Sequence, residues 1–146
     1  MNEDAALTAV GRAIQLSVAP VFLLSAIGAM LSVMTNRVAR VVDRARVVEA
    51  RLKEVAAGER GPWQRELASL ALRVRLIQRS ITFLTLTAIL VCAVVATMFV
   101  AAFFSVHFAA PVAFFFVSAM VLFLVGLLYF LREIFIATAN VRIGHP

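Results

Sequence analysis

The side chains whose types and spacing are best suited to chemistry are arginines in the stretch 36–55. Arg37, Arg44 and Arg51 recur every seven residues, and Arg40 falls beside them. On a helix this spacing aligns the guanidinium groups in one column, because seven residues make almost two helical turns. Guanidinium groups stay charged in proteins and suit phosphate and carboxylate groups. The column predicts contact with anionic membrane lipids or with a protein partner.

The same arginines also have a simpler interpretation. Arg and Lys beside a membrane segment fix its orientation and solvate one flank of a helix, with no ligand involved. Against the negative inner leaflet, by contrast, each of Arg37, Arg40 and Arg44 gains about 1 kcal/mol from anionic headgroups. Both interpretations stay open. Nucleic acid is not an expected partner, because the basic residues adjoin an apolar segment and lack interleaved aromatic residues.

No constellation typical of catalysis, metal binding or cofactor binding is found in the sequence. His107 and His145 are far apart in the chain, and the single cysteine, Cys92, lies in an apolar run without a charged neighbour that would activate it. Glycine-rich phosphate loops and histidine–glutamate metal motifs do not occur. We therefore expect a protein that is not an enzyme and has no cofactor.

The composition requires lipid as a solvent. Hydrophobic residues make up 63% of the 146 residues, and the mean hydropathy is +0.99. Three uncharged or nearly uncharged stretches, 14–35, 81–106 and 112–131, are long enough to cross a hydrocarbon core of about 30 Å. The first is expected to be a retained anchor, kinked at Pro20 because proline removes a backbone donor. The tail, 140–146, is expected to be flexible.

The segment 36–80 is polar but strictly periodic, with apolar residues three and four positions apart. This register begins inside the first apolar stretch and predicts one uninterrupted helix that continues out of the bilayer. Gly58, Gly61 and Pro62 predict a tight turn at 58–62, with a left-handed glycine cap and a new helix start. The predicted seam residues of the two arms are Val38, Val41, Ala45, Val48, Leu52 and Val55, and Trp63, Leu67, Leu70, Val74, Ile77 and Ile81. An antiparallel coiled-coil hairpin is expected.

The orientation follows from the distribution of positive charge. Eleven Arg and Lys residues lie between Arg37 and Arg79, none lies between the second and third apolar stretches, and Arg132 and Arg142 follow the third. Because positively charged loops stay in the cytoplasm, the N-terminus is expected outside, with the hairpin and the C-terminus in the cytoplasm. The fold class is therefore an all-α integral membrane protein with three transmembrane helices and a cytosolic hairpin.

The first apolar stretch also carries a small, polar face. Ser25, Gly28, Ser32 and Thr35 are three or four residues apart. Small residues at this spacing usually let another helix approach closely. The alternative is that several copies arrange these faces around a pore, above charged rings formed by the arginines. Three spans enclose little space, so a channel would require an oligomer.

One stretch resembles a known family. The segment PVFLLSAIG and the following LSVMTNRVARVVDRAR are similar to the signature of a bacterial membrane family, the domain of unknown function 2721 family. The residues that carry the resemblance are Pro20, Ser25, Gly28, Asn36, Arg37, Arg40, Asp43, Arg44 and Arg46. It implies a small three-helix protein of the bacterial inner membrane and supplies no activity or catalytic residue.

Together these patterns favour a self-associating or partner-docking scaffold. Its expected contacts are anionic lipids, further copies of the chain and a protein partner at the hairpin. A small oligomeric ion channel or transport accessory, lined by the first helix, is the alternative.

Overall fold

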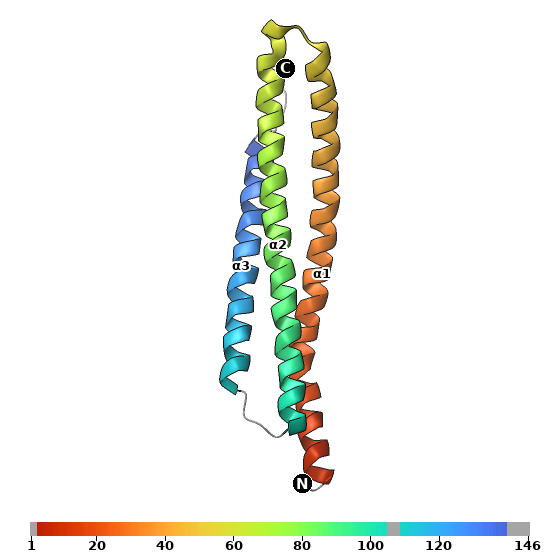
Figure 1. The fold of residues 1–146 in the computed structure, drawn as a ribbon, viewed down its shortest axis with the longest axis vertical. Helices are drawn as coiled ribbons and strands as arrows, with labels where there is room; N and C mark the ends of the chain where they lie inside the picture. Colours follow the sequence, from red (N-terminus) through yellow and green to blue (C-terminus); the bar gives the residue numbers. More distant parts are fainter. Residues whose placement is uncertain (1–2, 105–108, 140–146) are drawn as a thin grey trace. The chain divides into compact units, whose positions relative to one another are not determined.

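The computed structural model describes residues 3–104 and 109–139, and these residues form three long helices and one short turn of 3-10 helix. In Figure 1, α1 runs over Glu3–Glu54, the short helix η1 over Ala57–Glu59, α2 over Arg60–Phe104 and α3 over Ala109–Ala139. Within these ranges the chain is all-helical, as the periodicity predicted. His107 and the tail 140–146 lie outside the described residues.

Each of the three helices contains a segment long and apolar enough to cross a membrane. The most apolar windows have a mean hydropathy of 2.1 in α1 and 2.6 in both α2 and α3. Large apolar side chains such as Phe22, Phe103 and Phe114 are about 70% exposed. Exposing so much apolar surface to water is unfavourable, whereas contact of the same surface with lipid tails is not. The expectation of three membrane-length helices is confirmed.

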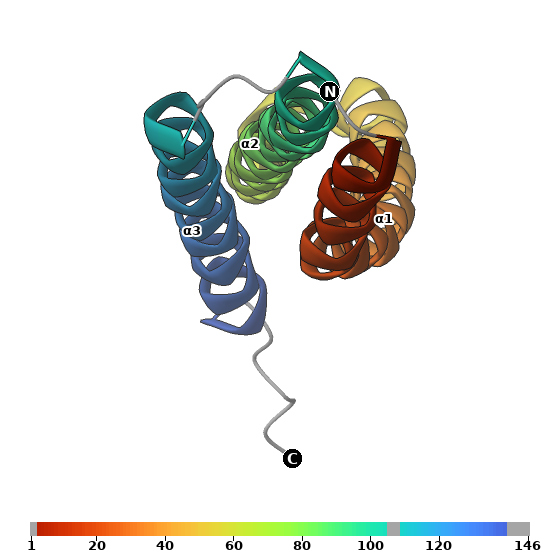
Figure 2. The same ribbon diagram turned by 90° about the horizontal axis from the view of Figure 1, so that it is seen from below.

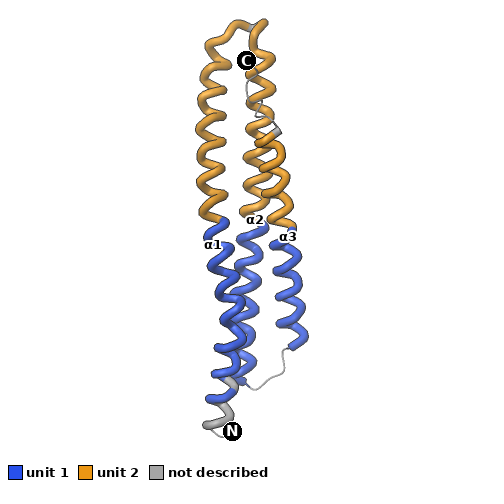
Figure 3. The backbone as a smooth tube through the Cα atoms, turned by 180° about the vertical axis from the view of Figure 1, so that it is seen from behind, with its two compact units in different colours: residues 1–30, 83–124 blue, residues 31–82, 125–146 orange. Residues whose placement is uncertain are grey.

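The helices divide into two compact units, coloured separately in Figure 3. Unit 1 comprises Met1–Met30 and Phe83–Leu124. In this unit α2 lies beside both α1 and α3 (Figure 2). Its core consists of small and medium-sized side chains, among them Ala13, Ile27, Leu84, Val91 and Ala119. Such side chains allow close packing between helices, which is the main source of helix association in lipid.

Unit 2 comprises Leu31–Thr82 and Val125–Pro146. Here α1 and α2 are the arms on either side of η1, and the C-terminal half of α3 packs with them. Every residue of the two predicted seams is buried or half-buried, and Val48 and Ile77 are fully buried. Among the intervening residues, Val47 and Leu72 are exposed, whereas Leu76 is buried. The three-four periodicity therefore identified the side of each arm that faces inward.

Helix α1 is continuous both at the end of the first apolar stretch and at Pro20. It continues without a break through residues 35 and 36, as the register predicted, and it also continues through Pro20, which lies buried inside it. The hydroxyl groups of Ser17 and Ser25 donate to the carbonyl oxygens of Ala13 and Val21. Each serine is thus satisfied by its own helix. The kink at Pro20 stays a prediction.

The turn between the arms differs from the one predicted. Gly58 does not adopt the left-handed conformation expected of a glycine cap, and Pro62 does not begin the second arm, because α2 begins at Arg60. Instead, η1 makes the turn, with the Glu59 amide donating to the Ala56 carbonyl at 3.0 Å. Pro62 falls in the first helical turn of α2, where a backbone donor has no partner within the helix and is not missed.

Candidate functional site

The most buried charged group described in the chain is the carboxylate of Glu133, in the C-terminal half of α3. Its side chain is fully buried, with 0% exposed. One oxygen, Oε2, accepts from Arg37 of α1 at 2.7 Å, and the other, Oε1, accepts from Arg73 of α2 at 3.0 Å. One carboxylate thereby joins α3 to both arms of unit 2. Since both its oxygens hold charge-assisted hydrogen bonds, the cost of burying this charge is offset.

Aromatic rings of α3 reinforce this junction. The guanidinium carbon of Arg37 lies 5.5 Å from the centre of the Phe130 ring, and that of Arg79 lies 5.8 Å from the centre of the Tyr129 ring. Both distances suit cation–π attraction, which adds roughly 0.5–1 kcal/mol at exposed positions and more where water is excluded. Tyr129 of α3 therefore contacts the second arm.

A neutral polar contact lies within the same unit. Ser80 of α2 is fully buried, and its hydroxyl lies 2.7 Å from the carbonyl oxygen of Gly126 and 3.4 Å from the sulfur of Met34. The three residues come from α2, α3 and α1. Ser80 therefore connects the same three helices as Glu133, with an uncharged hydrogen bond.

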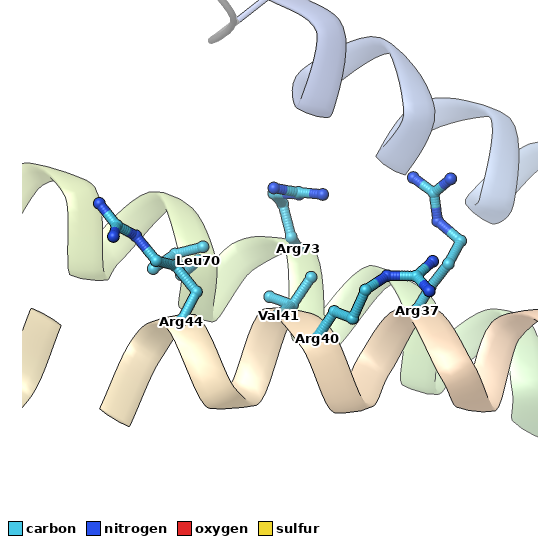
Figure 4. Close-up of a pocket in the computed structure, with 6 residues that line it drawn as sticks. All are labelled: Arg37, Arg40, Val41, Arg44, Leu70 and Arg73. Carbon is cyan, nitrogen blue, oxygen red and sulfur yellow. The ribbon is translucent and has the colours of Figure 1, made fainter. Parts of the chain in front are cut away.

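The fold brings only some arginines of the predicted column to the same cavity. Arg37, Arg40 and Arg44 of α1 and Arg73 of α2 line a cavity of about 310 Å³, with Val41 and Leu70 (Figure 4). These six residues are called the arginine cavity below. Arg51 lies exposed in the last turn of α1 and does not line it. A second cavity of about 460 Å³ shares Arg44, Leu70 and Arg73 with it and extends toward Arg65, Glu66, Ser69 and Ala137.

The arginines of the cavity differ in their pairing. Arg44 pairs with Glu66 of α2 at 2.7 Å, on a largely exposed surface where such a pair contributes little to stability. Arg40 is exposed and forms no ion pair with any residue that the structure describes. Asp43, the acidic residue between Arg40 and Arg44, lies 3.9 Å from Arg46. Arg40 therefore keeps its full charge at the edge of the cavity.

None of the helices that the structure describes covers the small face of α1. Ser25, Gly28, Ser32 and Thr35 are all exposed. A side chain added at Gly28 would meet nothing within 4 Å, and the Thr35 hydroxyl donates to the Leu31 carbonyl of its own helix. The predicted role of this face in helix packing or a pore would therefore involve a neighbour outside this chain.

The chemistry available in the described residues is electrostatic. No group of three or more His, Cys, Asp or Glu side chains able to hold a metal occurs within 3–104 and 109–139. Cys92 is an exposed free thiol. Guanidinium groups donate hydrogen bonds but do not give up protons in proteins, so they bind anions and do not act as bases. An arrangement dominated by arginines is suited to holding an anion.

Sequence reasoning missed Glu133 and Arg73 as members of this site. Both were taken only as charges near a helix end or on an arm. The available signal was that Glu133 is the sole acidic residue after Glu66, at the end of a highly apolar helix. An isolated acid in such a place nearly always has a basic partner.

Comparison with known proteins gives one match. A family model described as "Protein of unknown function (DUF2721)" matches residues 17–143, which is most of the chain. No curated protein and no solved structure that was compared matches the chain.

Proposed function

Because the chain belongs to the DUF2721 family, whose description assigns no activity, we propose from its own geometry that it is a non-enzymatic scaffold of the bacterial inner membrane. Three membrane-length helices support the location. The cavities of unit 2 are lined mainly by arginines and apolar side chains, which supports binding over catalysis. The scaffold associates with further copies of itself, contacts anionic lipid through Arg37, Arg40 and Arg44, and offers its hairpin to a protein partner.

The hairpin formed by the two arms lies in the cytoplasm as an antiparallel coiled coil, with the N-terminus outside. The excess of Arg and Lys between residues 37 and 79 supports this orientation. The buried seams, with Val48 and Ile77 at 0% exposure, support the pairing of the arms. The proposed scaffold therefore combines a cytoplasmic hairpin with paired arms.

A cysteine at the turn tests the orientation. Ala56 is exposed next to η1, so Ala56→Cys in a Cys92→Ala background places the sole thiol of the chain at the tip of the hairpin. We expect a membrane-impermeant maleimide to label this thiol in inverted vesicles and to leave it unlabelled in intact cells. The same protein in detergent serves as the control for reactivity. Labelling in intact cells at the detergent level would reverse the proposed topology.

The observation that carries self-association is the uncovered face of α1. In lipid, apolar surface gives no drive for association, so small residues that permit close backbone approach mark the faces where helices meet. Gly28 lies at the centre of this face with open space before it. A second copy of α1 presents the same small residues and satisfies that geometry.

Enlarging Gly28 tests this face directly. Gly28→Leu is expected to leave the helix content and the monomer intact, since no described residue beyond the neighbouring turns of α1 lies within 4 Å of the added Cβ. The oligomer fraction should fall by roughly fivefold, the equivalent of about 1 kcal/mol, because close approach is lost. Crosslinking in native membranes and in lipid nanodiscs measures the fraction. Ala29→Leu, at the exposed neighbouring position, is the matched control.

The Gly28→Leu variant also tests a second candidate function, a small oligomeric ion channel lined by the same face. The exposed hydroxyl groups of Ser25, Ser32 and Thr35 favour it. Arg37 counts against a continuous charged lining, because its guanidinium is committed to Glu133. Ion flux in liposomes that falls together with the oligomer in Gly28→Leu would support a channel. Equal oligomer fractions in the Gly28 and Ala29 variants would overturn self-association through this face.

A further inference from the structure

The arginine cavity has more positive charge than the protein neutralises. Four guanidinium groups line it, and the carboxylates that pair with them are Glu133, shared by Arg37 and Arg73, and Glu66, bound to Arg44. Four positive charges and two negative ones leave a net charge of +2. Like charges gathered on one cavity repel one another unless an anion lies between them.

The cavity also has hydrogen-bond donors without acceptors. The Nε of Arg37 is buried and has no hydrogen-bond partner in the part of the chain that the structure describes. Arg40 has no ion pair there either, although it lines the same cavity. Leaving a buried donor unsatisfied is unfavourable, so an acceptor that reaches it is favoured. Both groups are guanidinium forks, which match the oxygens of phosphate and carboxylate groups.

The arrangement of the arginines favours an anion with oxygens on several sides. In Figure 4, Arg37, Arg40 and Arg44 rise from α1 and Arg73 from α2, spread along the two helices, with Arg37 extending toward α3. The donors thus come from different helices. A planar carboxylate presents two oxygens, as Glu133 does to its two arginines. A phosphate group has more oxygens and up to two charges, so it can accept from several forks together.

We propose that the arginine cavity is a binding site for a phosphate group. The phosphate belongs either to the headgroup of an anionic membrane lipid or to a free phosphate. The volume of about 310 Å³ accommodates a phosphate with part of an attached group. Val41 and Leu70 supply the apolar part of its lining. The lipid source rests on the function proposed above, whereas the free phosphate source does not.

Arg40 is the residue to change, because it lines the cavity and forms no ion pair with another residue that the structure describes. The purified full chain in maltoside detergent is titrated with inorganic phosphate by calorimetry. In a second arm, the chain in nanodiscs of phosphatidylcholine, with or without phosphatidylglycerol, is analysed for retained lipid by native mass spectrometry. We expect binding in at least one arm, weakened about tenfold or more in Arg40→Gln through loss of charge-assisted hydrogen bonds. The arm that shows it identifies the source.

Arg46→Gln is the matched control, since Arg46 lies on the same helix, is exposed and does not line the cavity. It is expected to retain parental binding. Equal weakening in Arg40→Gln and Arg46→Gln would overturn the site in favour of diffuse attraction. Absence of binding in both arms would also overturn it. Crosslinking of the same samples reports self-association, so failure of the phosphate site and failure of the scaffold are separate results.

Discussion

Replacing Glu133 with glutamine is expected to lower the free energy of unfolding by about 3–5 kcal/mol. The carboxylate is fully buried, and its two arginine partners are only 26% and 22% exposed. Removing the negative charge leaves Arg37 and Arg73 close together in a poorly hydrated place with no counter-charge. The loss should appear in SDS-induced unfolding in mixed micelles, followed by the fluorescence of Trp63, the single tryptophan.

Two further variants show whether the loss of stability in Glu133→Gln comes from unpaired charge or from altered packing. Changing Arg37, Arg73 and Glu133 together to methionine is expected to restore stability to within about 1 kcal/mol of the parent or above it, because apolar groups of similar volume remove the whole desolvation cost. Arg132→Gln, an exposed neighbour on α3, is the control and should change stability by less than about 0.5 kcal/mol. A Glu133→Gln protein as stable as the parent would contradict the buried ion pairs.

The second large effect is expected at Val48, in the inward-facing seam of α1. Val48 is 0% exposed, whereas its neighbour Val47 is 50% exposed. Val48→Asp places an unpaired carboxylate between the arms, a change that costs several kcal/mol and is expected to separate them. Val47→Asp introduces the same charge on the same helix and should stay within about 0.5 kcal/mol of the parent.

Limited proteolysis with trypsin measures the difference between the two variants. The arms contain many Arg and Lys residues, and cleavage at these residues requires local opening of the helix. In Val48→Asp, cleavage between residues 37 and 79 should become at least tenfold faster. If the Val47 and Val48 variants are cleaved at equal rates, the assigned inward face of the arm is wrong.

Helical periodicity and length carried most of the fold prediction. The register of Val41 and Val48 identified the buried side of α1, since helix geometry repeats every 3.6 residues whatever surrounds it. The same regularity predicted that α1 would continue past residue 35. Three apolar stretches near membrane length left little freedom in the number of spans.

The site was less accessible from sequence, because its pairs join residues far apart in the chain. Arg37 and Glu133 are separated by 96 positions, and Arg73 and Glu133 by 60. Helical spacing relates neighbours within one element, so it aligned Arg37, Arg40 and Arg44 but assigned none of them a partner. It also placed Arg51 with them, although Arg51 does not line the cavity. The turn at Gly58 was hard to predict because a helix can end either in a 3-10 turn or in a left-handed glycine cap, and the two differ little in free energy.

The position of Glu133 after both of its arginine partners in the chain has a consequence for biosynthesis. Chains are made from the N-terminus, and domains acquire structure in that order. Arg37 and Arg73 therefore leave the ribosome well before the carboxylate that neutralises both of them. Until α3 is complete, the arms hold two arginines facing a common gap with no acid between them. Helix α3, which follows both arms in the chain, thus supplies the charge that allows them to close.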